Sequence, residues 1–381
     1  MDVFSLFLFL AQATSAPAPV RRAVTPTVSG TPEVLGIAKS SIWNRDSCLS
    51  TNVRGRLLWT CRDSQSDEDF LSSTASWTNF NSDGTPAITD SILDMYGTTN
   101  LSQSYFEVPS SMCGGASSVA GSCGNSTRYA IWPDTRSMPV STGDNGNIAL
   151  YTWIPNTHIT DDFVQLNENP SGSLYRADYS DSLGENDVPP AQLLDDSFWP
   201  AGSIRYGEYG FVIANGTAYL YGTLNGTLGV VLAKVSTDSI EDKNAYSYYT
   251  NSSWSSTAPS INDSSAAVTN AGTGGQGTYY WSAYFDSYVW IGAPYIGDNP
   301  IFQIATAPAP EGPWTEPSTF YTGEQGSASL GAYSQQAHPG MSKDFGSSSE
   351  IYLTYTKVNE GDENGEITGT YSTPIIHVIW E

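Results

Sequence analysis

Five apolar, aromatic-rich segments recur along the chain, and their first residues are 92, 69, 70 and 63 positions apart. Short alternating runs of this kind, separated by Gly, Pro, Asn and Asp, predict β-strands. Helix signals are nearly absent, with residues 190–196 as the one candidate for a helical turn. A second strand candidate precedes each segment, which gives the pairs 41–48 with 56–63, 129–135 with 148–155, 197–205 with 217–224, 278–285 with 287–294, and 332–340 with 350–357.

The later units add a third and a fourth strand candidate, so the repeat predicts an all-β fold, a five-bladed β-propeller with four-stranded blades. The last unit has a third strand at residues 374–381 and nothing after it. We expect an N-terminal strand at residues 28–38 to supply the missing outer strand and close the ring, because closure removes exposed strand edges. A β-sandwich with a second β domain explains the even spacing less well, so we expect a single propeller domain over residues 28–381.

The N-terminus predicts export. Residues 1–18 include a short apolar run that ends in small residues, as in a secretory signal peptide, although no basic residue precedes it. Residues 19–27 would then be a short N-terminal segment or propeptide. We expect a secreted, extracellular protein, in which six Asn-x-Ser/Thr sequons are glycosylation candidates: Asn100, Asn125, Asn215, Asn225, Asn251 and Asn262.

The four cysteines form two pairs that are close in sequence, and three pairings are open to them. The simplest pairing joins the cysteines that are closest to each other in sequence. A zinc site is not expected, because the chain has no C-x-x-C motif and its three histidines lie far apart in sequence. We interpret the cysteines as structural disulfides: Cys48 with Cys61, and Cys113 with Cys123.

The charge balance bears on the partner. Lys and Arg total 15 against 39 Asp and Glu, a formal charge of −24. Such a surface repels nucleic acid and anionic membranes and favours an uncharged or cationic partner, although the acidity could also serve solubility alone. We expect a monomer without cofactor or bound metal, with calcium in the central channel as the alternative.

Residues 44–65 predict a β-hairpin that turns at Arg54-Gly55. Facing residues of an antiparallel pair have numbers with a constant sum, which this turn sets at 109. One register therefore places two cysteines opposite each other and, two residues further out on the same face, two aspartates. The predicted pairs are Cys48 with Cys61 and Asp46 with Asp63.

Two carboxylates at facing positions repel, because their Cβ atoms lie about 4.5–5.5 Å apart. One pKa should rise while the other stays low, which suits a glycoside hydrolase with one protonated acid and one ionised nucleophile or base. Asp46 and Asp63 are thus the candidate catalytic pair. Two other interpretations remain: a calcium-binding pair, or aspartates that only tie down turns.

In a propeller the first strands of all blades converge on the central channel, so their polar residues should meet at its mouth. For His338 a hydrogen-bonded structural role is an equal alternative, and for the aromatic residues core packing is one. The candidate substrate contacts are Arg45, Trp132, Asp134, Gln276, Tyr284, Gln336 and His338.

Several of these segments also carry a family resemblance. The pairing of IWNRDS with GRLLWTCRDS resembles the opening hairpin of a secreted five-bladed propeller family long known only as a domain of unknown function. The segments RYAIWPD, NGTAYLYG with VVLAKV, APAPEGPWTEP, and YSQQAHPGM with SSEIYLTYTKV resemble later blades of that family. The similarity covers most of residues 41–357.

The resemblance implies a furanosidase-type activity, because that family includes endo-D-arabinanases. Its two catalytic aspartates lie on the opening hairpin and match Asp46 and Asp63. The chain departs from the family pattern at residues 47–48, where Ser-Cys replaces Gly-Gly, and at residues 61–62, where Cys-Arg replaces Phe-Gly. A disulfide would thus occupy a position where the family hairpin is small and open.

These observations predict a secreted glycoside hydrolase that acts on a neutral, furanosidic, arabinan-like polysaccharide through an aspartate pair. The alternative from another class is a non-catalytic, lectin-like propeller that binds carbohydrate. A lyase is a third option that the residues favour less, because no Lys, Tyr or His base stands beside a clear acid-neutralising site.

Overall fold

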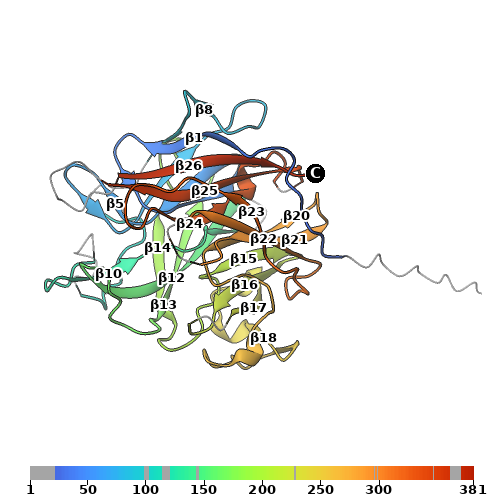
Figure 1. Ribbon diagram of the computed structural model, residues 1–381. Coiled ribbons are helices and arrows are strands. Elements are labelled where there is room, and N and C mark those ends of the chain that lie inside the picture. Colours follow the sequence, from blue (N-terminus) through green and yellow to red (C-terminus); the bar gives the residue numbers. More distant parts are fainter. Residues whose placement is uncertain are drawn as a thin grey trace, which may run out of the picture.

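The computed structural model describes residues 22–97, 103–113, 121–142, 146–226, 229–295, 297, 299–345, 347–360 and 370–381. The predicted signal peptide and Asn100 lie outside these residues. The described chain is all-β, with six sheets and only short 3-10 turns. Figure 1 shows the sheets grouped around the middle of the molecule, with the N-terminal strand β1 beside the C-terminal strand β26.

The strands group as follows. One sheet has the order β24 (Ala332–Ala337), β25 (Glu350–Asn359), β26 (Thr370–Ile379), β1 (Glu33–Ser40), β9 (Ile92–Met95), β8 (Ile88–Thr89). A second contains β10 (Thr127–Ile131), β11 (Met138–Thr142), β12 (Asn147–Thr160), β13 (Gly172–Tyr179), β14 (Ala191–Trp199). The third has β15 (Gly210–Ala214), β16 (Thr217–Thr223), β17 (Val230–Ser236), β18 (Ser247–Thr250), β19 (Ser253–Ser255). The fourth has β20 (Gly277–Ser282), β21 (Ser287–Gly292), β22 (Ile301–Ala307), β23 (Ser318–Thr322).

Two small sheets carry the N-terminal hairpin: β3 (Cys48–Val53), β4 (Arg56–Cys61) and β7 (Thr74–Thr78), and next to them β2 (Asn44–Arg45), β5 (Ser64–Gln65) and β6 (Phe70–Leu71). The 3-10 turns are η2 (Thr237–Ser239), η3 (Lys243–Ala245), η4 (Ser264–Ala266) and η5 (Pro339–Met341). No helix within the described ranges is long and apolar enough to cross a membrane.

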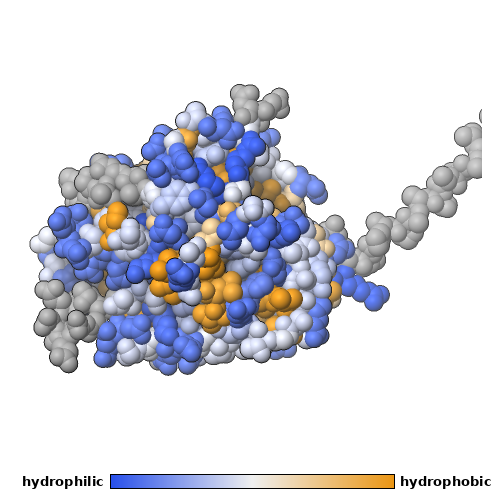
Figure 2. Space-filling model, turned by 90° about the horizontal axis from the view of Figure 1, so that it is seen from above, coloured by the Kyte–Doolittle hydropathy of each residue, from blue (hydrophilic) through white to orange (hydrophobic). Residues whose placement is uncertain are grey.

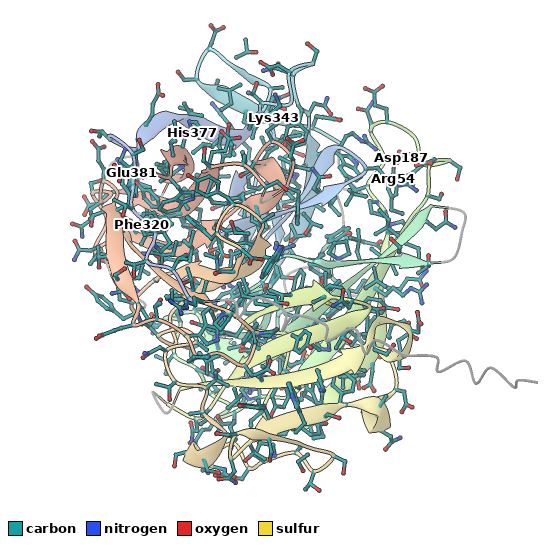
Figure 3. All side chains as sticks on the ribbon, turned by 90° about the vertical axis from the view of Figure 1, so that its right-hand side faces the viewer. Arg54, Asp187, Phe320, Lys343, His377 and Glu381 are labelled. Atoms are coloured by element: carbon teal, nitrogen blue, oxygen red, sulfur yellow. A yellow bond between two sulfur atoms is a disulfide. The ribbon has the colours of Figure 1, made fainter. Side chains whose placement is uncertain are left out.

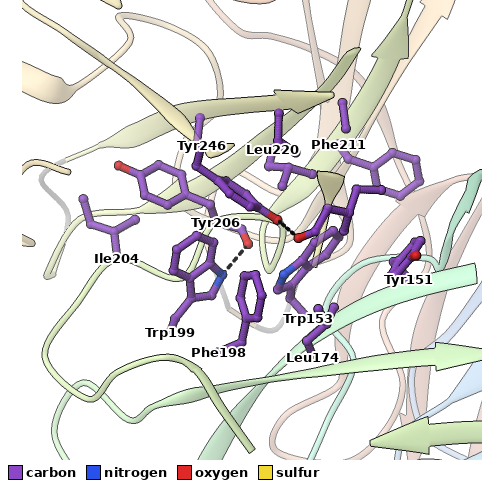
Figure 4. Close-up of a cluster of buried hydrophobic side chains, with 14 of the residues drawn as sticks. Tyr151, Trp153, Leu174, Phe198, Trp199, Ile204, Tyr206, Phe211, Leu220 and Tyr246 are labelled. Carbon is purple, nitrogen blue, oxygen red and sulfur yellow. Dashed lines mark hydrogen bonds between the residues drawn. The ribbon is translucent and has the colours of Figure 1, made fainter. Parts of the chain in front are cut away.

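The core lies between neighbouring sheets. Figure 4 shows one cluster in which Trp153 from β12, Phe198 and Trp199 from β14, and Leu220 from β16 pack together. The indole of Trp199 donates to the backbone oxygen of Tyr206 at 2.8 Å, which satisfies its polar atom inside the cluster. Two adjacent sheets therefore share one apolar layer.

The two ends of the chain meet in one sheet. The segment predicted to complete the C-terminal unit does pair with it, since β1 runs antiparallel to β26 and Val28 bridges Trp380. The register shifts near Gly36, whose φ of +146° suits glycine, and a Cβ there would collide with the backbone of Ser91. On the same side of the molecule, Phe320 of β23 packs on Trp380 with ring centroids 5.2 Å apart; Figure 3 labels Phe320 and Glu381.

The sequence analysis placed three of the expected first strands at the wrong residues. The hairpin strand is Cys48–Val53 rather than residues 41–48, and the strand before β16 is Gly210–Ala214 rather than residues 197–205. In the second sheet, Thr127–Ile131 and Met138–Thr142 pair with the two halves of the long strand β12. Proline explains part of the error: Pro200 lacks an N–H, so β14 ends at Trp199 and a turn follows.

The candidate helical turn at residues 190–196 is also wrong. These residues belong to β14, because pairing with β13 overrides local helix propensity.

The hydropathy of the surface agrees with the acidic composition of the chain. Figure 2 shows a face dominated by hydrophilic residues, with hydrophobic ones gathered in a patch near its middle.

Candidate active site

The predicted hairpin is present with its predicted register. Cys48 faces Cys61 in the β3–β4 ladder, and the two form a disulfide. Arg54 and Gly55 both have positive φ, +54° and +81°, as a two-residue primed turn requires. The second expected disulfide, Cys113–Cys123, is also present. Both disulfide predictions are confirmed.

The same register continues past the disulfide to the aspartates. The N–H of Asp46 donates to the backbone oxygen of Asp63 at 2.9 Å, and the N–H of Arg62 donates to the oxygen of Asp46 at 2.9 Å. Ser47 has a φ of +41°, so the chain kinks between the disulfide and Asp46. A non-glycine residue in this region marks a constrained backbone, which often accompanies a functional site.

Both aspartates line a cavity of about 730 Å³. The cavity has the volume of a small-molecule or oligosaccharide site. Three further residues that the sequence singled out lie in its wall. The predicted residues that the structure brings together here are Asp46, Asp63, Trp132, Asp134 and Gln276.

Asp46 is held by hydroxyl groups. Its Oδ1 accepts hydrogen bonds from the phenol of Tyr333 at 2.7 Å and from Ser47 Oγ at 2.8 Å. Burial raises the pKa of Tyr333, and the charge of Asp46 raises it further, so the phenol stays protonated and donates. Within the described part of the chain, all hydrogen bonds to this carboxylate end on Oδ1. Oδ2 is therefore available to a ligand or a water molecule.

Asp63 lies in different surroundings. Its carboxylate is buried, and both oxygens accept hydrogen bonds from the guanidinium of Arg128, a residue of β10. Burial raises the pKa of Asp63, because the charged form loses hydration, and Arg128 opposes part of this effect. The net direction is upward, so Asp63 keeps a proton more readily than an ordinary aspartate does.

Two more carboxylates reach the cavity, each paired with an arginine. Asp134 forms an ion pair with Arg62 and accepts a hydrogen bond from Gln276 Nε2 at 2.8 Å. Glu208 forms an ion pair with Arg205 three residues earlier. Four carboxylates thus meet three arginines at this site, and the site is close to neutral by comparison with the acidic molecule.

The sequence did not single out several of these groups. The residues missed are Arg62, Arg128, Arg205, Glu208, Tyr333 and Tyr371. Arg128 and Tyr333 come from sheets other than that of the hairpin, so no local pattern links them to the aspartates. Glu208 had a usable signal, because it lies two residues before β15, the first strand of its sheet, but the sequence analysis placed that strand too early.

The other predicted contacts lie outside the cavity wall. Arg45 points into the protein, where its guanidinium donates to Ser76 Oγ and Met95 Sδ. Gln336 is buried, and its amide donates to the backbone oxygen of Asp134. Tyr284 lies on the exposed turn between β20 and β21 and packs on Phe285. None of these three side chains lines the cavity.

His338 takes a structural position. It is 1% exposed, and its ring nitrogens lie 2.7 Å from Ser50 Oγ and 2.6 Å from Thr354 Oγ1. Trp59 packs against the ring at a centroid distance of 5.0 Å. Burial, with a smaller contribution from Arg136, lowers the pKa of His338 from 6.5 to about 3. The ring is therefore a neutral member of the core.

We expect this histidine to make the fold acid-sensitive. In the unfolded chain this imidazole binds a proton below about pH 6.5, whereas in the folded protein the buried ring stays neutral down to about pH 3. The free energy of unfolding should therefore fall as the pH decreases from about 6.5 to about 3. His338→Gln should flatten that part of the curve, whereas His377→Gln, at a partly exposed site beside Glu350, serves as control. Urea unfolding at pH 7 and pH 4 measures both. Equal pH dependence of His338→Gln and the wild type would contradict the expectation.

One group of potential metal ligands occurs within the described ranges. The ligand atoms of Cys113, Cys123 and His158 lie within 4.8 Å of one another. The two sulfur atoms form the disulfide, however, so they are not thiolates that could hold zinc. The cluster is better described as packing around the disulfide, with Tyr129 stacked on His158 at 4.5 Å.

Comparisons with known proteins extend this description. A family described as "Domain of unknown function (DUF4185)" matches residues 170–375. No curated protein matches the chain. Among solved structures, a putative hydrolase from Bacteroides ovatus superposes with a TM-score of 0.61 at 16% identity, over 89% of this chain and 87% of the other. At that identity the likeness shows a shared fold alone.

Two further structures are less similar. The GH43_1 enzyme from Xanthomonas citri in complex with xylose has a TM-score of 0.46 at 14% identity, over 90% of this chain and 89% of the other. The catalytic domain of the GH62 alpha-L-arabinofuranosidase from Coprinopsis cinerea has a TM-score of 0.45 at 10% identity, over 93% and 97%.

Proposed function

The chain belongs to the DUF4185 family, whose model matches more than half of its residues, and from this premise we propose that it is a glycoside hydrolase. We further propose that the five repeat units identified in the sequence form a five-bladed propeller that β1 closes, and that the protein is secreted. Its substrate would be a neutral, furanosidic, arabinan-like polysaccharide. The fold shared with the putative hydrolase from Bacteroides ovatus agrees with this class of activity.

The observation that carries the proposal is the pair of facing carboxylates in unlike surroundings. Glycosidases need one carboxylic acid to protonate the leaving oxygen and one carboxylate to act as nucleophile or base. Asp63, whose pKa burial raises, takes the role of acid. Asp46 lines the same cavity and keeps Oδ2 without a hydrogen bond from the described residues, so it takes the second role.

The chemistry would follow a double displacement, since facing ladder positions favour the short carboxylate separation of retaining enzymes. Oδ2 of Asp46 attacks the anomeric carbon while the proton of Asp63 passes to the leaving oxygen and the glycosidic bond breaks. Asp63, now ionised, takes a proton from water, whose oxygen displaces Asp46 from the sugar. Each step uses only these two residues and water, so the proposal needs no cofactor.

The electrostatics of the cavity support a neutral substrate. Arg62 and Arg205, the arginines in the cavity wall, each already pair with a carboxylate, so neither is left to bind an acidic sugar. The molecule as a whole carries a formal charge of −24 and repels polyanions. The remaining wall offers aromatic and amide groups, such as Trp132 and Gln276, which suit hydroxyl-rich neutral rings.

The direct test is hydrolysis by the purified protein. We expect it to release oligosaccharides from debranched arabinan, with less or no release from xylan, β-1,3-galactan and polygalacturonate, as measured by product analysis with mass spectrometry. Retention on an arabinan column without new reducing ends would support the lectin-like alternative. Cleavage of polygalacturonate in preference to every neutral polymer would contradict the neutral-substrate proposal.

A further inference from the structure

Two exposed apolar side chains stand in the wall of the cavity. Phe163 lies on the loop that follows β12 and is 56% exposed, and Leu330 lies on the loop that precedes β24 and is 43% exposed. They come from two different sheets and line the same cavity. Large apolar side chains in the wall of a cavity offer contact surface to a bound ligand.

The loop that carries Phe163 is held in place by its own backbone. The N–H of Phe163 donates to the oxygen of Thr160 at 2.9 Å, and the N–H of Thr160 donates to the oxygen of Val164 at 3.0 Å. The hydroxyl of Thr160 also accepts from the N–H of Val164. Phe163 itself has a φ of +61°, which is rare for a bulky residue and common where a ligand is held.

The loop that carries Leu330 is anchored in the same way. Its flanks bond each other between Gly326 and Gly331, and Ala328 donates to the backbone oxygen of Val358 at the end of β25. Both apolar groups are therefore presented in the open by fixed backbone, so little conformational entropy would be lost when they meet a ligand.

We propose that Phe163 and Leu330 form an outer subsite that holds a neutral sugar residue of the polymer beyond the one in the cavity. The inference rests on the proposed function in that it assumes a saccharide in the cavity. It goes further in assigning a chain that extends past the catalytic pair, with one ring packed on Phe163. Aromatic rings bury large apolar area at low entropic cost, and the C–H faces of sugar rings supply the matching surface.

The charges around this subsite select the kind of chain. Phe163 directly follows Asp161 and Asp162, and Glu168 follows a few residues later, all of them exposed. No Lys or Arg occurs in residues 159–170. A polyuronate or an anionic lipid headgroup would be repelled here, whereas a neutral glycan meets no penalty. The occupant is therefore a neutral polysaccharide.

The test compares long and short substrates in the full-length protein. Phe163→Ala should lower kcat/KM on debranched arabinan by about tenfold, the size of one well-packed aromatic contact, and leave a short aryl arabinofuranoside unaffected. Val164→Ala is the matched control, because Val164 shares the loop and is 57% exposed but does not line the cavity. Phe163→Trp should keep the wild-type kcat/KM on the polymer. Leu330→Ser should lower this kcat/KM, but by less than Phe163→Ala does.

Binding measurements separate this inference from the proposed function. If the wild type binds arabinan without cleaving it, the hydrolase proposal fails, and a loss of affinity in Phe163→Ala still supports the subsite. If the wild type cleaves arabinan and Phe163→Ala matches it on every chain length, the subsite is wrong and the hydrolase stands. Binding to phosphatidylcholine vesicles that Phe163→Ala abolishes would assign the rim to lipid and overturn the inference, as would a wild type that binds no neutral polymer.

Discussion

Replacing Asp46 by Asn is expected to lower kcat on the polysaccharide by about 10²–10⁴-fold while the fold survives. The amide keeps the shape of the carboxylate, and its oxygen can still accept the hydrogen bonds from Tyr333 and Ser47. What the variant loses is the ionised group that attacks the sugar or activates water. Steady-state kinetics on debranched arabinan, with thermal unfolding as a check on the fold, measures the effect.

Asp63→Asn should lower kcat on the polymer by a similar factor, but the size of its effect should depend on the leaving group of the substrate. If Asp63 donates a proton to the leaving oxygen, a substrate with a good leaving group, such as a nitrophenyl arabinofuranoside, should retain most of its rate. The wild type should also lose activity as the pH rises through the raised pKa of Asp63, because the acid is then ionised. Asp63→Asn should lack that limb of the pH profile.

The matched control is Asp94→Asn, at an exposed position of β9 that does not line the cavity, which should retain full activity. Wild-type rates in both Asp46→Asn and Asp63→Asn would refute the assignment. Glu208 and Asp134 would then be tested, because they are the other carboxylates in the cavity wall. Loss of folding in Asp63→Asn alone would mean that its chief role is to neutralise Arg128.

The sequence could predict the features that depend on the alternation of side chains along a strand and on residues that lie close together in the chain. A two-residue turn at Arg54-Gly55 leaves one register for the hairpin, and that register places Cys48 on Cys61 and Asp46 beside Asp63 without knowledge of the rest of the fold. The strand-rich repeat likewise predicted an all-β chain, and the C-terminal unit with its missing strand predicted the pairing of β1 with β26.

The rest could not be predicted because it depends on how separate sheets meet. Tyr333 reaches Asp46 from 287 positions away, and Arg128 reaches Asp63 from 65 positions away. No periodicity within a strand encodes such contacts. For His338 the sequence left a substrate contact and a structural role equally open, and the packing of separate sheets decides between them, because Ser50 and Thr354 contact its ring nitrogens inside the core.

Deleting residues 374–381 is expected to abolish cooperative folding, because these residues form most of a strand that pairs on both sides, with β25 and with β1. The buried side chains that the deletion would remove include Ile375, Ile376, Val378 and Trp380. Burial of each such side chain contributes about 1.5–3 kcal/mol, so the loss approaches the whole stability of a typical domain, roughly 5–15 kcal/mol. The missing strand would also leave β1 and β25 with open edges prone to aggregation.

A pair of point variants separates this effect from simple truncation. Ile376 is fully buried and Ile379, in the same strand, is 45% exposed. Ile376→Ala should lower the free energy of unfolding by about 2–5 kcal/mol, as for other large-to-small changes in a core. Ile379→Ala should change it by no more than about 0.5 kcal/mol, as surface substitutions usually do. Urea unfolding measures both, and an unchanged midpoint in the deletion variant would show that the fold does not depend on the pairing of its two ends.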